Sequence, residues 1–351
     1  MRTLVIAIGL LTIAACAGFM TREESTAVPG KPAHHRSDGR FVNTDGEAID
    51  KPLSALLKWQ REAPDVKRVS LPLAENDPAY LRANRTDSTL TWIGHSTFLL
   101  QHNGVNILTD PHFGQRASPV RFAGPKRLVP PGVDLDALPD IDIVVISHNH
   151  YDHLDRYTVK ALTRKQAANP PTWFVPLKQK AWFESLGVPD VVELDWWQAA
   201  DVGDWTVTAV PVKHWTSRTP FDRNTVLWAG WALQTDGFSF AHIGDSGYSA
   251  DFKAIGDRLG PFDLAAVPIG AYLPRWFMQA AHMNPEEAVK VHRDLRAARS
   301  VAMHWGTFVL TDEPVEDPPR QLALALREAG VDPDAFLVLQ HGETLPLAGG
   351  R

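Results

Sequence analysis

Short apolar runs recur along the chain from about residue 88 onward, and many of them end on a polar side chain. Residues 89–109 read as two β-strands around the pair Asn103-Gly104, which is a strong signal for a tight hairpin turn. Residues 141–147 are almost purely apolar, which is typical of a central strand buried on both faces. Further strands are predicted at 172–176, 191–197, 205–215, 262–272, 300–306 and 335–344, and residues 228–247 are predicted to form a hairpin with its turn at Asp236-Gly237.

Helical patterns lie between several of these strands. They cover residues 52–62, 156–165, 284–295 and 318–330. In the third of these segments Pro285 and Glu286 occupy the first turn, where both residue types are favoured. Because strands lead and helices are interposed, the sequence predicts an α/β layered fold with two sheets and outer helices.

The N-terminus carries a different pattern. One early cation, Arg2, precedes an apolar run at 4–15 that is too short to span a bilayer and is typical of a secretory signal. The letters IAAC at 13–16 resemble a bacterial lipobox, in which cleavage precedes Cys16 and that cysteine is lipidated. Cys16 is the only cysteine, so the chain has no intrachain disulfide. A plain signal peptide or an uncleaved anchor is the alternative.

From this pattern we expect a signal peptide at 1–15 and a lipid-anchored tether at 16–50. The tether is polar and rich in Gly, Pro and Ser, and we interpret its pair His34 and His35 as an exposed loop rather than a metal site. The expected location is the bacterial cell envelope, facing the periplasm. The absence of an acid directly after Cys16 slightly favours the outer membrane.

Composition bounds the class of protein. The chain has 351 residues, of which 44% are hydrophobic, so there is enough apolar material for a large core. The formal net charge is −6, whereas a general nucleic-acid binder would need a basic face. We therefore expect no nucleic-acid partner.

Metal-ligand residue types gather where the apolar strands end. They are Asp110, His148, His150, Asp152, His153, His214, Asp245 and His304. Rigid strand ends hold loop side chains in register, so five separate strands ending on Asp or His indicate one constructed site. Imidazole and carboxylate without thiolate suit zinc and similar divalent ions. The number of ligands exceeds what one metal needs, and two metals sharing a carboxylate account for it.

At these residues the chain resembles the metallo-β-lactamase superfamily and, more narrowly, the phospholipases D that hydrolyse N-acyl-phosphatidylethanolamine. The resemblance rests on TWIGHSTFLL, TDPHFGQRASP, SHNHYDHLD, ELDWW, GDSGY, HMNPEEAVKVH and MHWGTF, and above all on GPFDLAAVPIGAYLPRWFM. It implies an αββα sandwich, two central mixed β-sheets flanked by helices, as the hydrolase domain at 51–351. It also implies two Zn²⁺ ions as cofactors.

The resemblance also implies a role for each ligand. One metal is held by His148, His150 and His214, the other by Asp152, His153 and His304, and Asp245 bridges them. Asp110 and His95 support the site.

Further roles near the reacting group follow from the same resemblance. Asp152 or Asp245 relays a proton. His282 orients the phosphate or protonates the leaving group, or else has no catalytic part. Ala281 replaces a polar amide of the animal members, which puts that head-group contact in doubt here. His242, by alternation from Asp245, is expected to be buried facing away from the metals.

The implied activity is hydrolysis of N-acyl-phosphatidylethanolamine-like lipids to phosphatidic acid and an N-acylethanolamine, through a hydroxide bridging the two metals. The implied partners are a phospholipid, the membrane through the lipid anchor, and a second copy of the chain in a homodimer. Two alternatives stay open. One is a lactonase, or another esterase or phosphodiesterase of small metabolites, that uses the same site. The other is a non-catalytic envelope lipoprotein.

Overall fold

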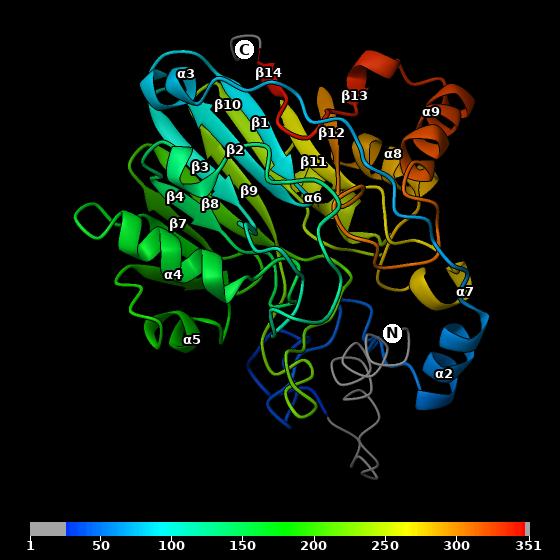
Figure 1. Ribbon diagram of the computed structural model, residues 1–351. Helices are drawn as coiled ribbons and strands as arrows, with labels where there is room; N and C mark the ends of the chain where they lie inside the picture. Colours follow the sequence, from blue (N-terminus) through cyan, green and yellow to red (C-terminus); the bar gives the residue numbers. More distant parts are fainter. Residues whose placement is uncertain (1–25, 348–351) are drawn as a thin grey trace.

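Two β-sheets stacked face to face form the centre of the protein, with helices on the outside (Figure 1). The computed structural model describes residues 26–347. Each sheet has seven strands, in the orders β14-β1-β2-β3-β4-β5-β6 and β13-β12-β11-β10-β9-β8-β7. Both sheets mix parallel and antiparallel neighbours. The predicted α/β sandwich is confirmed.

The first sheet is antiparallel on one side, from β14 to β3, and parallel from β3 to β6. Its strands are β1 Thr89–Gly94, β2 Thr97–His102, β3 Val105–Thr109, β4 Ile143–Val145, β5 Thr172–Pro176, β6 Val191–Leu194 and β14 Thr344–Pro346. The parallel half is the half that supplies the histidine-rich loop after β4.

The second sheet has the complementary arrangement, with parallel pairing from β10 to β13 and antiparallel pairing from β10 to β7. Its strands are β7 Ala199–Val202, β8 Trp205–Val210, β9 Gly230–Thr235, β10 Phe238–His242, β11 Leu264–Pro268, β12 Arg299–Met303 and β13 Phe336–Leu337.

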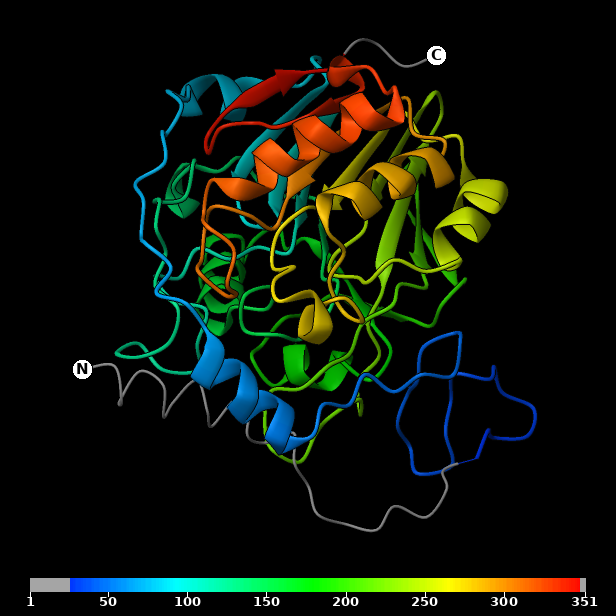
Figure 2. The same cartoon turned by 90° about the vertical axis from the view of Figure 1, so that its right-hand side faces the viewer.

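Helices cover the outer faces of the sandwich. On the side of the first sheet lie α4 Arg156–Lys165 and α5 Lys180–Glu184. On the side of the second sheet, α8 Pro285–Asp294 and α9 Asp317–Ala329 lie side by side (Figure 2), and α6 Asp251–Leu259 packs against α8. The remaining helices are α2 Leu53–Glu62, α3 Pro78–Ala83 and α7 Arg275–Met278, with short 3₁₀ turns η2 Leu135–Ala137 and η3 Pro333–Ala335.

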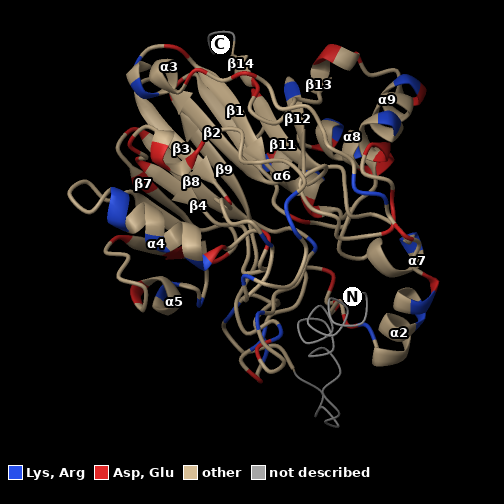
Figure 3. Ribbon diagram, viewed as in Figure 1, with Lys and Arg blue, Asp and Glu red and all other residues tan. Residues whose placement is uncertain are grey.

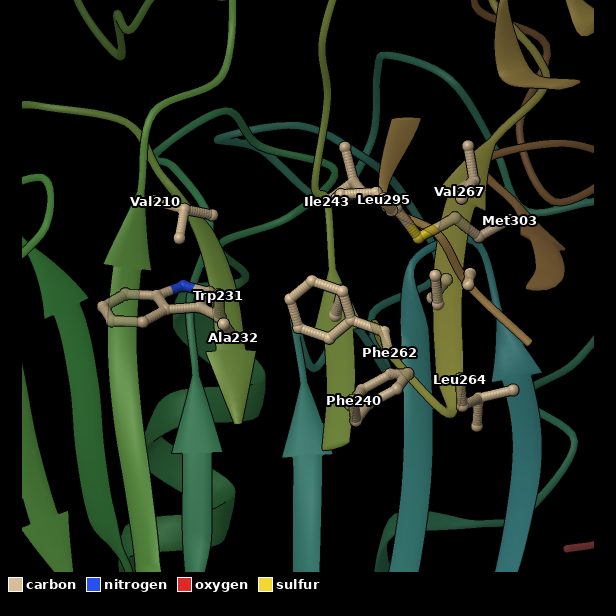
Figure 4. Packing of buried hydrophobic residues seen from close by; sticks show 14 of the residues in the cluster. Val210, Trp231, Ala232, Phe240, Ile243, Phe262, Leu264, Val267, Leu295 and Met303 are labelled. Atoms are coloured by element: carbon tan, nitrogen blue, oxygen red, sulfur yellow. The ribbon is translucent and has the colours of Figure 1, made fainter. Parts of the chain in front are cut away.

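The space between the sheets is filled by large apolar side chains. Trp231 of β9 is fully buried, and its indole N–H donates to the carbonyl of Ile146 in the facing sheet at 2.9 Å. Figure 4 shows part of this cluster, with Phe240, Phe262 and Leu264 lying close together. Lysine, arginine and acidic residues lie mainly on helices and connecting loops (Figure 3), which leaves the sandwich interior apolar.

Strand β4 confirms the prediction of a strand buried on both faces. Ile143 and Val145 belong to the cluster between the sheets, whereas Val144 and Ile146 belong to a second cluster under α4 and α5. Alternate side chains of a strand point to opposite faces, so a strand with a core on each side shows no polar alternation.

The expected single strand before Asn103-Gly104 is wrong, because the chain turns once more between β1 and β2. His95 adopts a left-handed backbone with φ 54° at this turn. Both flanking strands are completely buried, and the turn is marked only by the short stretch Gly94-His95-Ser96, which the prediction of one strand overlooked. The turn at Asn103-Gly104 itself is confirmed, with φ of 49° and 79°.

Residues 26–50 lie against the sandwich, and the interpretation of His34 and His35 as an exposed loop is wrong. Both side chains are buried, at 7% and 8% exposure, and both contact the carboxylate of Asp195 after β6. Polar composition indicated a loop, but it could not show that the loop folds back onto a buried acid.

The predicted signal peptide at 1–15 and the lipidation residue Cys16 lie outside the described residues. None of the helices found between residues 26 and 347 has the length and apolar character needed to cross a bilayer.

The two faces of α9 give a test of this packing. Leu322 is 1% exposed and Leu324 is 44% exposed on the same helix. We expect Leu322→Ala to lower the free energy of unfolding by about 2–5 kcal/mol, because it leaves a cavity in the core. The matched variant Leu324→Ala changes it by less than about 0.5 kcal/mol. Urea unfolding followed by circular dichroism measures both. A larger loss for Leu324→Ala than for Leu322→Ala would show that α9 is packed the other way round.

Candidate metal centre

The ligand-type residues sit in loops that follow the C-terminal ends of five strands. Asp110 follows β3 and the segment 148–153 follows β4, both in the first sheet. His214, Asp245 and His304 follow β8, β10 and β12 of the second sheet. The structure brings all of them together at one edge of the sandwich. Each sheet thus supplies part of the site.

Three imidazoles form the first group. His148 Nε2 lies 2.9 Å from His150 Nδ1, and His214 Nε2 lies 3.2 Å from the same atom. His148 and His214 are buried, and His150 is half-buried. The Oδ2 atom of Asp245 lies 3.9 Å from the Nε2 atoms of both His148 and His214. This group matches the residues that the resemblance assigns to one metal.

The second group consists of Asp152, His153 and His304. The Nε2 atoms of the two histidines lie 3.5 and 3.3 Å from Asp152 Oδ2. They lie 3.2 and 3.1 Å from Asp245 Oδ2. Asp245 therefore stands between the two groups, where a bridging carboxylate would lie.

Hydrogen bonds orient three of the imidazole rings toward the centre of the site. The Nδ1–H group of His148 donates to Ser147 Oγ at 2.9 Å, that of His153 to Asp110 Oδ2 at 2.9 Å, and that of His214 to the Ala281 carbonyl at 3.0 Å. With these protons committed, each Nε2 directs a lone pair into the site. The donors therefore fit divalent cations, for which nitrogen and carboxylate oxygen are preferred ligands.

The charge of the site also fits cations. Within residues 26–347, neither Asp152 nor Asp245 is paired with a lysine or an arginine. Burial disfavours both charged carboxylates, but the surrounding histidines hold the pKa of each well below its usual range. Two buried carboxylates so placed need positive charge nearby.

Without a metal, the histidines of the second group supply that charge as protons. Burial lowers the pKa of His304, but Asp245 and the hydrogen bond with Asp152 raise it to about 9. The pKa of His153 is likewise held well above its usual range by the two carboxylates, against the effect of burial. Divalent cations must displace these protons, so their binding releases protons at neutral pH.

Asp110 is the support that the sequence predicted. Its Oδ1 accepts from the Ser147 backbone N–H at 2.6 Å, and its Oδ2 accepts from the Ser147 hydroxyl at 2.6 Å. His153 and His242 also donate to Oδ2, at 2.9 and 3.0 Å. Burial opposes ionisation of Asp110, but His242 and His153 hold its pKa below the usual range.

Sequence reasoning missed Ser147 and the supporting role of His242. His242 is buried, as expected, yet it reaches the site through Asp110. Ser147 could have been noticed only as the polar residue that closes an apolar strand directly before His148.

His95 is the second predicted support, and its Nε2–H donates to Asp152 Oδ2 at 3.0 Å. The backbones of His95, Asp110 and His304 all have positive φ, at 54°, 35° and 60°. Residues other than glycine adopt this region rarely, and such strain tends to collect at functional sites. Here it turns three side chains toward the same centre.

His282 lies beside the metal groups, with Nδ1 3.8 Å from Asp245 Oδ2. Its side chain is 17% exposed and lines a cavity that opens above the site. Burial lowers its pKa to about 4, so the ring is neutral at neutral pH. At position 281 the side chain is a methyl group, but the backbone carbonyl orients His214.

The cavity has a volume of about 270 Å³ and a polar floor formed by His150, Asp152, Asp245 and His282. Its walls are mostly apolar. They include Leu53, Leu56 and Trp59 of α2, Phe277 and Met278 of α7, and Pro119, Pro125, Trp215 and Leu310 from loops. Trp59 and Phe277 stack with ring centroids 4.9 Å apart, which joins α2 to α7. The contribution of α2 was not predicted.

Comparison with known proteins agrees with this geometry. Residues 105–305 match the family described as the Beta-lactamase superfamily domain, and this range includes every predicted metal ligand. Among solved structures, a metallo hydrolase from Ignicoccus hospitalis superposes with a TM-score of 0.55 at 22% identity, covering 74% of this chain and 98% of that one. At that identity the likeness concerns the fold.

Two curated relatives are closer in sequence. The N-acyl-phosphatidylethanolamine-hydrolyzing phospholipase D 1 of Caenorhabditis elegans is 42% identical over 266 residues, which is 72% of this chain and 74% of the relative. An uncharacterized protein of Mycobacterium tuberculosis is 43% identical over 323 residues, 90% of this chain and 82% of that protein. The chain thus belongs to the β-lactamase superfamily, as a metal-dependent hydrolase with N-acyl-phosphatidylethanolamine-hydrolysing phospholipases D among its homologues.

Proposed function

We propose that the protein is a phospholipid phosphodiesterase of the phospholipase D type, acting on N-acyl-phosphatidylethanolamine-like lipids with two zinc ions. The observation that carries the proposal is the shape of the cavity, which has apolar walls and a floor of metal ligands. A lipid phosphate at the floor would place its acyl chains against the walls of α2 and α7. The similarity to phospholipases D from Caenorhabditis elegans and Saccharomyces cerevisiae supports the same substrate class.

Two cations line the same cavity and complement an anionic phosphate. Lys51 has its ammonium group 5.6 Å from the Phe277 ring centroid, and burial lowers its pKa. Arg223 packs its guanidinium over Trp215 at 4.1 Å and pairs with Asp50 at 2.7 Å. Both side chains pack on aromatic rings, so they place positive charge at the cavity while the wall around them stays mostly apolar.

The ligands His148, His150 and His214 would hold one ion and Asp152, His153 and His304 the other, with Asp245 shared. Bound divalent ions supply a water of lowered pKa and neutralise the phosphate oxygens. Asp152, whose side chain is 14% exposed at the cavity floor, would accept the proton of the attacking water and pass it to the leaving alkoxide, which departs as the N-acylethanolamine. His282, being neutral, donates a hydrogen bond that orients the phosphate or the leaving oxygen.

We further propose that lipidated Cys16 holds the enzyme at the envelope membrane that contains its substrate. The predicted tether at 16–50 then leads into α2, which forms one wall of the cavity. The exposed side chains of Leu57 on α2 and Trp276 on α7 are next to that wall, and they give this end of the molecule an apolar rim.

The substrate is tested by incubating the protein with zinc and N-acyl-phosphatidylethanolamine in water enriched in ¹⁸O. We expect phosphatidic acid and N-acylethanolamine, with the label in phosphatidic acid only, because water attacks phosphorus. Lipid mass spectrometry measures both products. Unchanged lipid together with opening of an acyl-homoserine lactone would establish the lactonase alternative instead.

The metal assignment is tested with Asp245→Ala. We expect the bound metal per chain to fall and turnover to drop by at least about 100-fold, because the shared carboxylate is removed. Asp236→Ala, in the exposed turn between β9 and β10, is the matched control and should change neither quantity. Metal analysis after dialysis and a phosphodiesterase assay measure the two effects. Full metal content with normal turnover in Asp245→Ala would refute the two-metal site.

The apolar wall is tested with Phe277→Ala. We expect KM for long-chain N-acyl-phosphatidylethanolamine to rise about tenfold or more, since the loss of a buried aromatic surface costs about 1–3 kcal/mol of binding. Turnover of the small water-soluble ester bis(p-nitrophenyl) phosphate should stay unchanged. Leu324→Ala, on the outside of α9, controls for surface effects. An equal loss on both substrates would show that the wall does not bind acyl chains.

A further inference from the structure

A second cluster of ligand-type side chains lies outside the metal centre and shares no residue with it. His34 Nε2 lies 2.7 Å from Asp195 Oδ1, and His35 Nε2 lies 2.6 Å from Asp195 Oδ2. All three residues are less than 9% exposed. The two histidines come from the N-terminal segment and Asp195 comes from the loop after β6, so the cluster joins distant parts of the chain.

The donor atoms of this cluster lie close enough together to hold one metal ion. All three donor atoms lie within 4.8 Å of one another, as do those of each catalytic group. Consecutive residues of an extended strand point to opposite sides, but the chain turns at His34, and both rings face one carboxylate. Two imidazoles and one carboxylate make a known zinc ligand set that leaves one position for water.

The surroundings hold the carboxylate in place. The Trp196 backbone N–H donates to Asp195 Oδ1 at 2.8 Å, and the Gln198 side-chain oxygen accepts from the Asp195 backbone N–H at 2.9 Å. The Trp196 ring lies 4.3 Å from His34, and the Phe41 ring lies 5.1 Å from His35. Oriented ligands in an apolar surround bind a cation more tightly, because less is lost in ordering them.

We propose that His34, His35 and Asp195 bind a third divalent cation of the zinc type, which fastens the N-terminal segment to the first sheet. This assignment is independent of the bond that the enzyme cleaves. The fastened segment runs directly to the active site. Asn43 accepts a hydrogen bond from the His214 backbone N–H at 3.0 Å, and Ile49 and Lys51 line the cavity. The cation would therefore stabilise both a metal ligand and the start of the cavity wall.

The test uses a full-length chain in which each of the two catalytic groups has lost ligands, with His148→Ala, Asp245→Ala and His304→Ala combined. We expect this chain to retain about one zinc ion after dialysis against zinc chloride, and zinc to raise its Tm. Adding His34→Gln and His35→Gln should remove the ion and abolish the shift in Tm. Metal analysis and thermal unfolding supply the readouts, neither of which depends on catalysis.

The matched control is His292→Gln in the same chain, which replaces another buried histidine and should leave the ion in place. If the chain with the three combined substitutions unfolds cooperatively but binds no zinc, the proposal is wrong. The cluster is then held together by hydrogen bonds alone. Should the combined variant not unfold cooperatively, Asp195→Asn in the otherwise unchanged chain decides the matter. A loss of one ion per chain supports the third site, and an unchanged metal content refutes it.

Discussion

The buried carboxylate of Asp110 is the interaction on which the metal centre depends. It accepts hydrogen bonds from Ser147 and His153, which follow β4 of the first sheet, and from His242 at the end of β10 in the second sheet. A carboxylate in an apolar interior is costly unless it is fully hydrogen-bonded. Only the native alignment of the two sheets provides these donors together. The same bonds therefore fix the sheets relative to each other and direct His153 toward the metals.

The parts of the site differ in how rigidly the fold holds them. The metal ligands follow strand ends and are oriented by backbone or buried side chains. The cavity walls come from α2, α7 and loops, whose positions depend on side-chain stacking such as that of Trp59 on Phe277. Side chains that bind metal or react must be placed within about half an ångström, whereas the position of an apolar wall side chain can vary more. The chain uses strands for the first requirement and surface helices for the second.

Whether a feature could be predicted from the sequence depends on how far apart in the chain the residues that determine it lie. The turn at Asn103-Gly104 is a local signal and is confirmed, and the candidate ligand residues, which are also local signals, lie together in the structure. The turn at His95 lies between two strands that are buried throughout, and only the short stretch Gly94-His95-Ser96 marks it in the sequence. His34 and His35 were misjudged because their burial depends on Asp195, which is about 160 residues away. A pattern of neighbouring residues cannot predict a contact between residues so far apart in the sequence.

The N-terminal segment is held to the sandwich by contacts of individual residues, and the cluster at Asp195 is one of them. Residues 26–50 contain little regular structure, so ordering them costs about 1–2 kcal/mol per residue in backbone entropy. A disulfide would restrict such a segment, but the chain has only one cysteine. Cross-linking through metal ligands achieves the same restriction with histidine and aspartate. His34, His35 and Asp195 are placed where such a cross-link would act, between the first sheet and the segment that leads through Asn43 to His214.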